Sequence, residues 1–417
     1  MTPSPALPPR FHGGQALLLQ LPLAGIAACT LACGCIPPRS DAKLAEPGRT
    51  TLTGAEANAA TPAAKAEANE EATRAAVQHL RWTLEQLSRG GRFALGHEDS
   101  TAYGVGWTEE ADRSDVKSVC GSHPAVYGWD VFRIEKGASE NGDGVDFAML
   151  RQRIQEAHSR GGINTVSWHA DNPVSGGDAW DTTPAVRAIV PGGSHHELYR
   201  SYLARVADFL ESCRGNAGEL IPLIFRPFHE HTGSWFWWGR EHTTDAEYVA
   251  LWRFTVDYFR QERGFSHLLF AFSPAGAHLR TASDYVFRYP GDAYVDVMGV
   301  DHYYDTDVAS LVRAVSVTVA AAEAHDKLPA LTEFGIQDGL SEVTPDNWFS
   351  KNFFEPLVTH PSASRIAYAL AWRNAGVDHC FVPYPGHRTA ADFRRVCEDP
   401  RLVLQRDLPL GKDDPSR

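Results

Sequence analysis

The feature that most constrains the fold is a regular alternation of short apolar runs and longer amphipathic segments, which begins near Thr73 in this 417-residue chain. Eight short runs have the length and apolar content of buried strands. They are Phe93–His97, Ala125–Asp130, Gly162–His169, Ile221–Phe228, His267–Ser273, Val295–Asp301, Pro329–Phe334 and Ile366–Trp372. The amphipathic segments between them predict helices, among them Tyr199–Leu210, Tyr248–Phe259 and Leu311–Ala324.

Eight strands that alternate with helices over roughly 330 residues predict an α/β fold, namely a single (β/α)8 barrel domain over residues 71–410. A doubly wound open sheet is the alternative, but no Gly-x-Gly-x-x-Gly motif follows a predicted strand. In a barrel, the carboxyl ends of the strands meet at one face, where catalytic residues gather. The predicted strands end in His97-Glu98, Trp129-Asp130, Trp168-His169, His229-Glu230, Ser273-Pro274, Asp301-His302-Tyr303, Glu333 and Trp372-Arg373. This mixture of acids, histidines and aromatic rings is typical of a sugar-cleaving cleft.

The N-terminal segment differs in composition from the rest. A short apolar run from Ala16 to Ala28 is too short to cross a bilayer, so residues 1–28 are typical of a signal peptide. The sequence Ile-Ala-Ala-Cys that ends at Cys29 resembles a bacterial lipobox, which would place a lipid on Cys29, with Cys33 as a second candidate. An ordinary cleaved signal is the alternative. On either interpretation, we expect a protein that is secreted or lipid-anchored at the bacterial cell envelope, with no other contact with a membrane.

Residues 29–70 are rich in Ala, Glu, Thr and Pro and contain almost no large apolar side chain, so we expect a disordered linker there. Four cysteines lie beyond it, and none belongs to a Cys-x-x-Cys motif, which argues against structural zinc. Cys380 and Cys397 are a candidate disulfide pair for an oxidising compartment. Cys120 and Cys213 are expected in the core or in disulfides.

The net charge of −13 comes from 52 acidic and 39 basic residues, and so acidic a surface repels phosphate backbones. We therefore expect no nucleic-acid partner. The chain also contains 11 Trp, 13 Tyr and 20 Phe, and flat rings can stack on the apolar faces of sugars. This composition permits a carbohydrate-binding protein without requiring one.

Two glutamates have the chemistry that such a cleft needs. Glu230 ends the fourth predicted strand and Glu333 the seventh, and these strand ends face each other across the mouth of a barrel. Cleavage of a glycosidic bond uses two carboxyl groups, one to protonate the leaving oxygen and one to attack or to activate water. Glu230 must begin protonated, which burial among aromatic rings favours. Glu333 must begin ionised, and Arg226 or the hydroxyl of Tyr303 could stabilise that form.

The segment Arg226–Gly239 (RPFHEHTGSWFWWG) strongly resembles the acid/base segment of glycoside hydrolase family 26, a family with many β-mannanases, and Leu331–Gly335 (LTEFG) resembles its nucleophile segment. Five shorter motifs match in the same order within roughly Arg92–Arg373: Gly96–Asp99, Tyr127–Asp130, Val166–His169, Gly299–Tyr304 and Ala371–Arg373. The resemblance implies that Glu230 is the acid/base and Glu333 the nucleophile of a double displacement that retains anomeric configuration. It implies no cofactor.

The resemblance also implies substrate contacts around the two glutamates. They are His169, His229, Arg226, Trp235, Tyr303, Trp372, Trp180, His97 and Asp130. Trp372 would lie under the sugar at the −1 subsite, with Trp235 and Trp180 as aromatic walls. For the histidines at positions 169 and 229, the alternative is a structural hydrogen bond. For Trp180, the alternative is packing in the core. For His97 and Asp130, the alternative is that they support the residues that contact the substrate without contacting it themselves.

His231, next to the acid/base, departs from the pattern common in the family and is expected to face the cleft. The run His229-Glu230-His231 lacks the His-Glu-x-x-His spacing of a zinc site, so we expect no metal. These observations predict a monomeric, retaining endo-β-1,4-mannanase that acts on mannan, galactomannan or glucomannan. An exo-acting mannobiohydrolase, a β-glucanase and a β-1,3-xylanase are alternatives within the resemblance. A carbohydrate-binding lipoprotein is an alternative outside it, although the presence of both glutamates argues against that.

Overall fold

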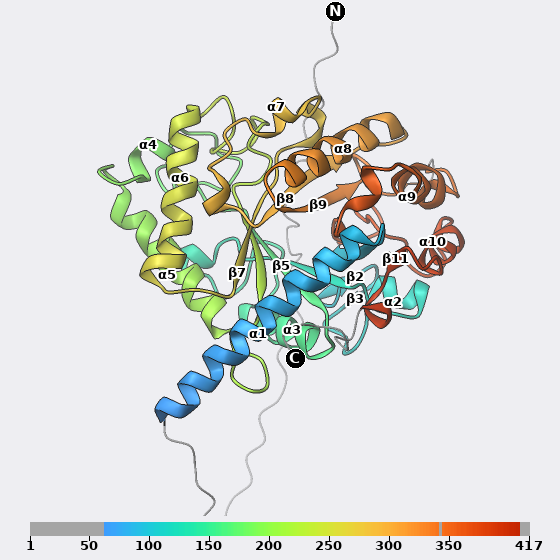
Figure 1. The fold of residues 1–417 in the computed structure, drawn as a ribbon, viewed down its shortest axis with the longest axis horizontal. Coiled ribbons are helices and arrows are strands. Elements are labelled where there is room, and N and C mark those ends of the chain that lie inside the picture. The colour runs from blue at the N-terminus through green and yellow to red at the C-terminus, as the bar shows by residue number, and fades with distance from the viewer. Residues whose placement is uncertain (1–61, 342–343, 409–417) are drawn as a thin grey trace, which may run out of the picture.

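The computed structural model describes residues 62–341 and 344–408, which form a closed barrel of parallel strands with helices around it (Figure 1). The barrel strands are β1 (Phe93–Glu98), β4 (Val126–Asp130), β5 (Ile163–Trp168), β6 (Leu223–Pro227), β7 (Leu268–Phe272), β8 (Val297–Tyr303), β9 (Leu328–Gly335) and β10 (Tyr368–Ala371). Each of the eight predicted strands is present, and the predicted (β/α)8 barrel is confirmed.

The barrel closes where its first strand pairs with its last. Ala94 of β1 is in register with Tyr368 of β10, and His97 with Ala371. A short strand, β11 (Leu402–Val403), pairs with the beginning of β1 at Phe93. Most strand residues are buried on both faces, because side chains fill the interior and helices cover the outside. This is why the strands appear in the sequence as continuous apolar runs.

Helices connect the strands and cover the barrel. They are α1 (Pro62–Arg89), α2 (Asp115–Cys120), α3 (Phe147–Ser159), α4 (Val186–Ile189), α5 (His196–Ser212), α6 (Asp245–Asp257), α7 (Ala282–Tyr285), α8 (Val308–Ala324), α9 (Glu355–Thr359) and α10 (Ala390–Cys397). The predicted helices correspond to α5, α6 with the π-helical turn Tyr258–Glu262, and α8. None of the helices in the described ranges is long and apolar enough to cross a membrane.

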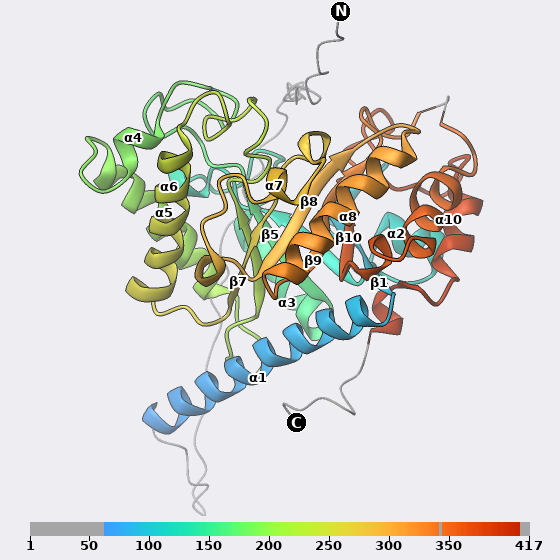
Figure 2. The same cartoon turned by 45° about the horizontal axis from the view of Figure 1, so that its top comes forward.

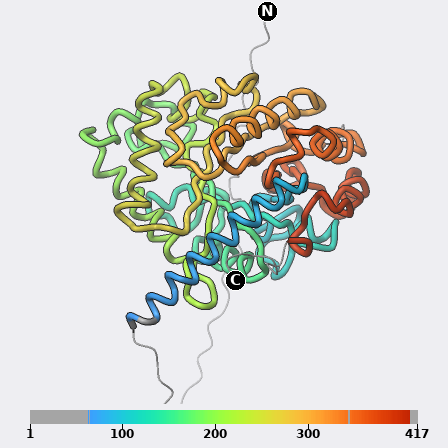
Figure 3. Tube along the Cα trace, in the orientation of Figure 1, coloured from blue at the N-terminus to red at the C-terminus, as the bar shows by residue number. Residues whose placement is uncertain are grey.

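Helix α1 passes beneath the barrel (Figure 2), and its trace crosses the molecule in Figure 3. Its Leu80, Leu84 and Leu87 are buried against residues near the beginnings of the strands, such as Ala94 and Leu328. The amino-terminal end of the barrel is thereby closed by apolar contact, which leaves the opposite end free for the site.

The start of α1 at Pro62 corrects the predicted linker over residues 29–70. The last part of that range is helical, because Ala, Glu and Lys have high helix propensity and Pro is accepted in the first turn. The apolar residues that anchor this helix come later along the chain, from Leu80 onward. Residues 1–61, with the predicted signal peptide, Cys29 and Cys33, lie outside the described residues, and so do 409–417. The proposed export and lipid attachment stay predictions.

The cysteine contacts also differ from the expectation. Cys397, the last residue of α10, lies with its Sγ 2.8 Å from Sγ of Cys120 at the end of α2. Cys380 is buried in the loop after β10, where its thiol faces the carbonyl of Val377. The candidate pair Cys380–Cys397 is therefore wrong. The reason is that α2 and α10, far apart in sequence, pack together across the closure of the barrel.

Candidate active site

A cavity with an aromatic and acidic wall lies at the carboxyl ends of the barrel strands. The residues that line it are His169, Trp180, His229, Glu230, Trp235, Phe236, Tyr303, Glu333, Trp372 and Phe381. The two glutamates reach it from the segments at the ends of β6 and β9, which are distant in sequence. The fold thus brings the predicted carboxyl pair together in one cavity.

Glu230 lies on a strained turn directly after β6. Its φ of 53° and the φ of 49° at Phe228 are in the left-handed region, which side chains other than glycine rarely adopt. Several hydrogen bonds hold the turn. Among them, the backbone N–H of Glu230 donates to the carbonyl of Ser273 over 2.7 Å, and Nε1 of Trp235 donates to Oε2 of Glu230 over 2.7 Å. The strain is therefore offset by contacts that aim the carboxyl group into the cavity.

Burial raises the pKa of Glu230 well above its ordinary value, and the nearby carboxylates of Asp301 and Glu333 raise it further. The hydrogen bond from Trp235 and the charge of Arg226 oppose the rise without cancelling it. Glu230 consequently keeps its proton at a pH where an exposed glutamate has lost it. This is the property required of a general acid.

Glu333 has the opposite environment, since cationic and neutral donors hold both carboxylate oxygens. Arg226 Nη2 forms an ion pair with Oε1 of Glu333, and the Tyr303 hydroxyl donates to Oε2 over 2.7 Å. Arg226 Nη1 also contacts Oδ2 of Asp301 at 2.9 Å, so one guanidinium group bridges two buried carboxylates. Charge-assisted bonds of this kind fix the direction in which the Glu333 carboxylate faces.

A chain of three side chains supports the wall on the β4 and β5 side. Oδ2 of Asp130 pairs with Nδ1 of His169, whose Nε2 lies 3.1 Å from Nε2 of His229. Burial disfavours a charged His169, but the Asp130 carboxylate more than offsets this and raises the pKa of His169. Burial opposes ionisation of Asp130 too, yet His169 and backbone donors lower its pKa.

His229 is the neutral member of this chain, because burial and then the charges of Arg226 and His169 hold its pKa well below the ordinary value. A charged His169 can therefore donate through Nε2 to Nε2 of His229. Nδ1 of His229 then carries the proton, and it has no hydrogen-bond partner among the described residues. Among all the described residues, no three His, Cys, Asp or Glu side chains are grouped so that they could hold a metal ion.

Trp180 comes from the long segment after β5, which the sequence could not assign to a conformation. Its ring stacks on His169, with centroids 5.4 Å apart and planes at 14°, and its centroid lies 5.5 Å from that of Phe236. The segment is fixed in place because the N–H of Trp237 donates to the carbonyl of Ala179 over 3.1 Å. Trp180 therefore forms part of the wall of the cavity.

Three of the predicted substrate contacts lie behind the wall. Arg226 and Asp130 are 2% exposed and their charges are used within the protein, and His97 is 1% exposed with Nδ1 3.1 Å from Oγ of Ser100. Burial lowers the pKa of His97 to about 4. Arg226 and Asp130 support the lining residues Glu333 and His169, which is the alternative that the sequence left open for Asp130.

The prediction that His231 faces the cleft is wrong. Its ring is fully buried between the rings of Tyr248 and Phe272, at centroid distances of 4.6 and 4.7 Å. In the turn after β6, the Glu230 side chain faces the cavity while the His231 ring packs into the core. Phe381 is a lining residue that sequence reasoning missed, because it follows β10 in a loop with no recognisable motif.

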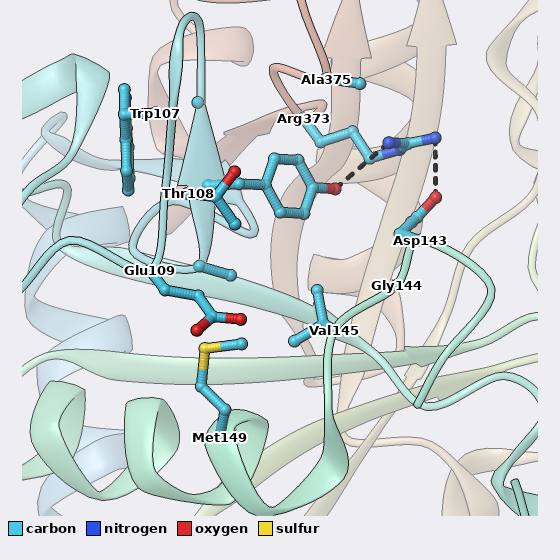
Figure 4. A pocket seen from close by; sticks show the side chains of 12 residues that line it. Trp107, Thr108, Glu109, Asp143, Gly144, Val145, Met149, Arg373 and Ala375 are labelled. Carbon is cyan, nitrogen blue, oxygen red and sulfur yellow. Dashed lines mark hydrogen bonds and ion pairs between the residues drawn. The ribbon is translucent and has the colours of Figure 1, made fainter. Parts of the chain in front are cut away.

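In a second cavity of about 210 Å³, the lining includes Arg373, which follows Trp372 of the first cavity in the chain. Its wall comprises Ala102, Tyr103, Gly104, Trp107, Thr108, Glu109, Asp143, Gly144, Val145, Met149, Arg373 and Ala375 (Figure 4). Part of it belongs to the hairpin of β2 (Tyr103–Gly104) and β3 (Trp107–Thr108). Arg373 donates to the hydroxyl of Tyr103 over 3.2 Å and pairs with Asp143 at 2.8 Å, so polar groups converge at one side of the cavity.

Comparison with known proteins agrees with this site. Residues 68–346 match the model of glycosyl hydrolase family 26. The chain belongs to glycosyl hydrolase family 26. The resemblance noted in Arg226–Gly239 and Leu331–Gly335, which carry the two cavity glutamates, is thereby confirmed at the level of the family.

Proteins of known name or structure are similar to most of the chain. The mannan endo-1,4-β-mannosidase of Bifidobacterium adolescentis is 32% identical over 349 residues, which are 79% of this chain and 35% of that protein. The chain thus spans about a third of the length of that relative. Among solved structures, a family 26 β-mannanase from Bacteroides ovatus has a TM-score of 0.75 at 38% identity, covering 82% of this chain and 98% of that one. A modular endo-β-1,4-mannanase from Cellulomonas fimi has a TM-score of 0.75 at 37% identity, covering 80% and 76%.

Proposed function

We propose that this family 26 protein is a retaining endo-β-1,4-mannanase, which cleaves the main chain of mannan, galactomannan or glucomannan by double displacement. The observation that carries the proposal is the single cavity in which a proton-holding Glu230 and an ion-paired Glu333 both lie. The relatives in Bifidobacterium adolescentis and Bacteroides ovatus, a mannan endo-1,4-β-mannosidase and a β-mannanase, support the substrate class.

In the first step, a carboxylate oxygen of Glu333 attacks the anomeric carbon while Glu230 passes its proton to the glycosidic oxygen. The bond between the anomeric carbon and that oxygen breaks, and the sugar chain on the far side leaves as an alcohol. Arg226 and Tyr303 hold Glu333 in position, so the Glu333 side chain loses little conformational entropy when the substrate binds.

The second step uses the same pair with Glu230 as a base. Once Glu333 is an ester it has no charge, and that charge is one of the causes that raise the pKa of Glu230. The pKa of Glu230 therefore falls, and its carboxylate takes a proton from the water that attacks the anomeric carbon. The ester bond breaks, Glu333 regains its charge and the product keeps its β configuration.

The presence of two cavities, lined by the consecutive residues Trp372 and Arg373, supports a substrate that is a chain rather than a single sugar. The rings of Trp180, Trp235 and Trp372 offer flat surfaces around the cleavage point. Beyond Trp372, the second cavity has room for a further sugar unit, with Arg373 among the polar groups that could bind its hydroxyls. Such an extended site favours cleavage inside a polysaccharide.

The substrate and the mode of action are tested by incubating the full chain with linear mannan, galactomannan, glucomannan and mixed-linkage β-glucan and resolving the products over time. We expect mixed manno-oligosaccharides from the first time points. A single disaccharide from the start would make the protein an exo-acting mannobiohydrolase. Products from β-glucan alone would show that the substrate is a β-glucan and not a mannan. No product from a folded protein would favour a carbohydrate-binding role.

The mechanism is tested by a mannoside that carries fluorine at C2 and a reactive leaving group at C1, because such a compound slows the second step more than the first. We expect one covalent adduct, which peptide mapping places on Glu333, and no adduct in Glu333→Ala. Proton NMR of early products should show the β anomer. An early α anomer, or an adduct on another residue, would contradict double displacement through Glu333.

A further inference from the structure

We propose that Cys120 and Cys397 are the site of a disulfide bond that covalently closes the barrel. The two sulfur atoms lie 2.8 Å apart at the ends of α2 and α10. A bonded pair needs a separation of about 2.05 Å. The two sulfur atoms therefore need to approach by only about 0.75 Å to form the bond.

The backbones around the two thiols are held together independently of the sulfurs. Nη1 of Arg406 donates to the carbonyl of Cys120 over 3.0 Å, and Nη2 of the same side chain donates to the carbonyl of Cys397 over 3.3 Å. Nε of Arg394 on α10 donates to the carbonyl of Val119 on α2 over 2.8 Å. The approach of the two cysteines is therefore built into the packing of α2 and α10, which lie side by side in Figure 1.

The position of the pair in the fold gives the bond its effect. Helix α2 lies between β1 and β4 in the chain, α10 follows β10, and β1 and β10 pair to close the barrel. A bond between residues 277 positions apart would thus join the two ends of the barrel beside the junction of β1 and β10. It would restrict the unfolded chain over nearly the whole domain and hold α10 in place.

The accessibility of the two thiols suits stepwise oxidation by a disulfide such as oxidised glutathione. Cys120 is partly exposed, whereas Cys397 is 2% exposed, and burial raises the pKa of Cys397. The Cys120 thiol loses its proton, its thiolate attacks the glutathione disulfide, and one glutathione thiolate leaves. The Cys397 thiol then loses its proton and displaces the second glutathione thiolate. The two cysteines lose two electrons and two protons, and one oxidised glutathione becomes two reduced glutathiones.

The test is performed on the purified full chain after equilibration with oxidised or reduced glutathione, followed by alkylation and a non-reducing peptide map. We expect a peptide pair joined through Cys120 and Cys397 in the oxidised sample alone. The melting temperature of the oxidised protein should exceed that of the reduced protein by roughly 5–10 °C.

Three variants separate the bond from simple packing, because the readout is the difference between oxidised and reduced melting temperatures within each variant. Cys120→Ser and Cys397→Ser should each abolish the difference. Cys380→Ala, which removes another buried thiol, should keep it. Full alkylation of both cysteines after oxidation, their separate capture by glutathione, or a bond from Cys397 to any other cysteine would overturn the proposal.

Discussion

Nε1 of Trp235 donates a hydrogen bond to Oε2 of Glu230 over 2.7 Å, so a single side chain both lines the cavity and acts on the protonation of the proposed acid/base. This donor favours the ionised carboxylate and thereby opposes the effect of burial, which raises the pKa of Glu230. The position of that pKa is a balance between the two effects, and removal of either one shifts it in a known direction.

The first prediction concerns Trp235→Phe, which keeps an aromatic ring but removes the donor. Without the hydrogen bond, the pKa of Glu230 rises further, so its proton persists to higher pH. The basic limb of the pH profile of kcat/KM should move to more alkaline pH. Trp180→Phe is the matched control, because Trp180 lines the same cavity and its ring stacks on His169. An unmoved limb in the Trp235 variant would show that another group sets it.

The second prediction concerns Arg226→Met, which removes the cation between Asp301 and Glu333. Both carboxylates stay buried, with side-chain exposures of 0% and 5%, and lose their shared partner. Loss of one partner from a buried ion pair costs about 3–5 kcal/mol, so urea unfolding should show a free energy of unfolding lower by that amount. Turnover should fall as well, because Glu333 loses a contact that orients it.

Arg263→Met is the control for that experiment. Arg263 also contacts two acids, Asp208 and Glu211, but these side chains are 68% and 44% exposed and solvent screens the interaction. Its removal should cost about 0–1 kcal/mol. Equal losses of stability in the two variants would indicate that burial of the Arg226 bridge has no special effect.

The third prediction is a pH dependence of stability that involves Asp130 and His169. The pKa of Asp130 in the folded protein lies below 3.8. Ionised Asp130 therefore stabilises the fold above that value, and this stabilisation disappears as pH falls through the folded pKa. The pKa of His169 in the folded protein lies above 6.5. Charged His169 therefore stabilises the fold fully below 6.5, and this stabilisation is lost as pH rises through the folded pKa. Asp130→Asn should therefore cost about 1.5–3 kcal/mol at a pH between these limits and less at pH 9.

Chemical denaturation of this variant and of the unmodified protein at several pH values checks the expectation. Asp292→Asn is the control, since Asp292 pairs with His325 at the surface and is 60% exposed. It should change stability little at any pH. A constant cost of Asp130→Asn between pH 5.5 and pH 9 would mean that His169 is not charged in the folded protein.

The fourth prediction concerns the packing of α1 beneath the barrel. Leu84 is fully buried there, so Leu84→Ala should lower the free energy of unfolding by about 2–5 kcal/mol through lost contact and a residual cavity. The kinetic constants at low temperature should hardly change, because the site lies at the opposite end of the strands. Gln78→Ala, at an exposed position of the same helix, should stay within about 0.5 kcal/mol. A large change in KM for Leu84→Ala would contradict this separation.

The strands and the two glutamates could both be identified from the sequence, because both depend on the apolar runs of buried strands. Strands buried on both faces must be apolar over their whole length, and a residue such as Glu230 or Glu333 at the end of such a run stands out against it. The segment Arg226–Gly239 adds a long and specific motif to that signal. Local patterns of this kind involve residues that are close together in sequence, so they can be recognised without knowledge of distant contacts.

The remaining features depend on which distant segments meet, and this is decided only when the barrel closes. Whether Arg226 contacts a sugar or bridges Asp301 and Glu333 depends on three strands at once. The contact of Cys397 with Cys120 follows from the pairing of the first and last strands. The sequence by itself therefore determined the strands and the chemistry at their ends. The tertiary structure decided which of these groups face the cavity and which support it, because side-chain burial and charge pairing are properties of neighbours in space.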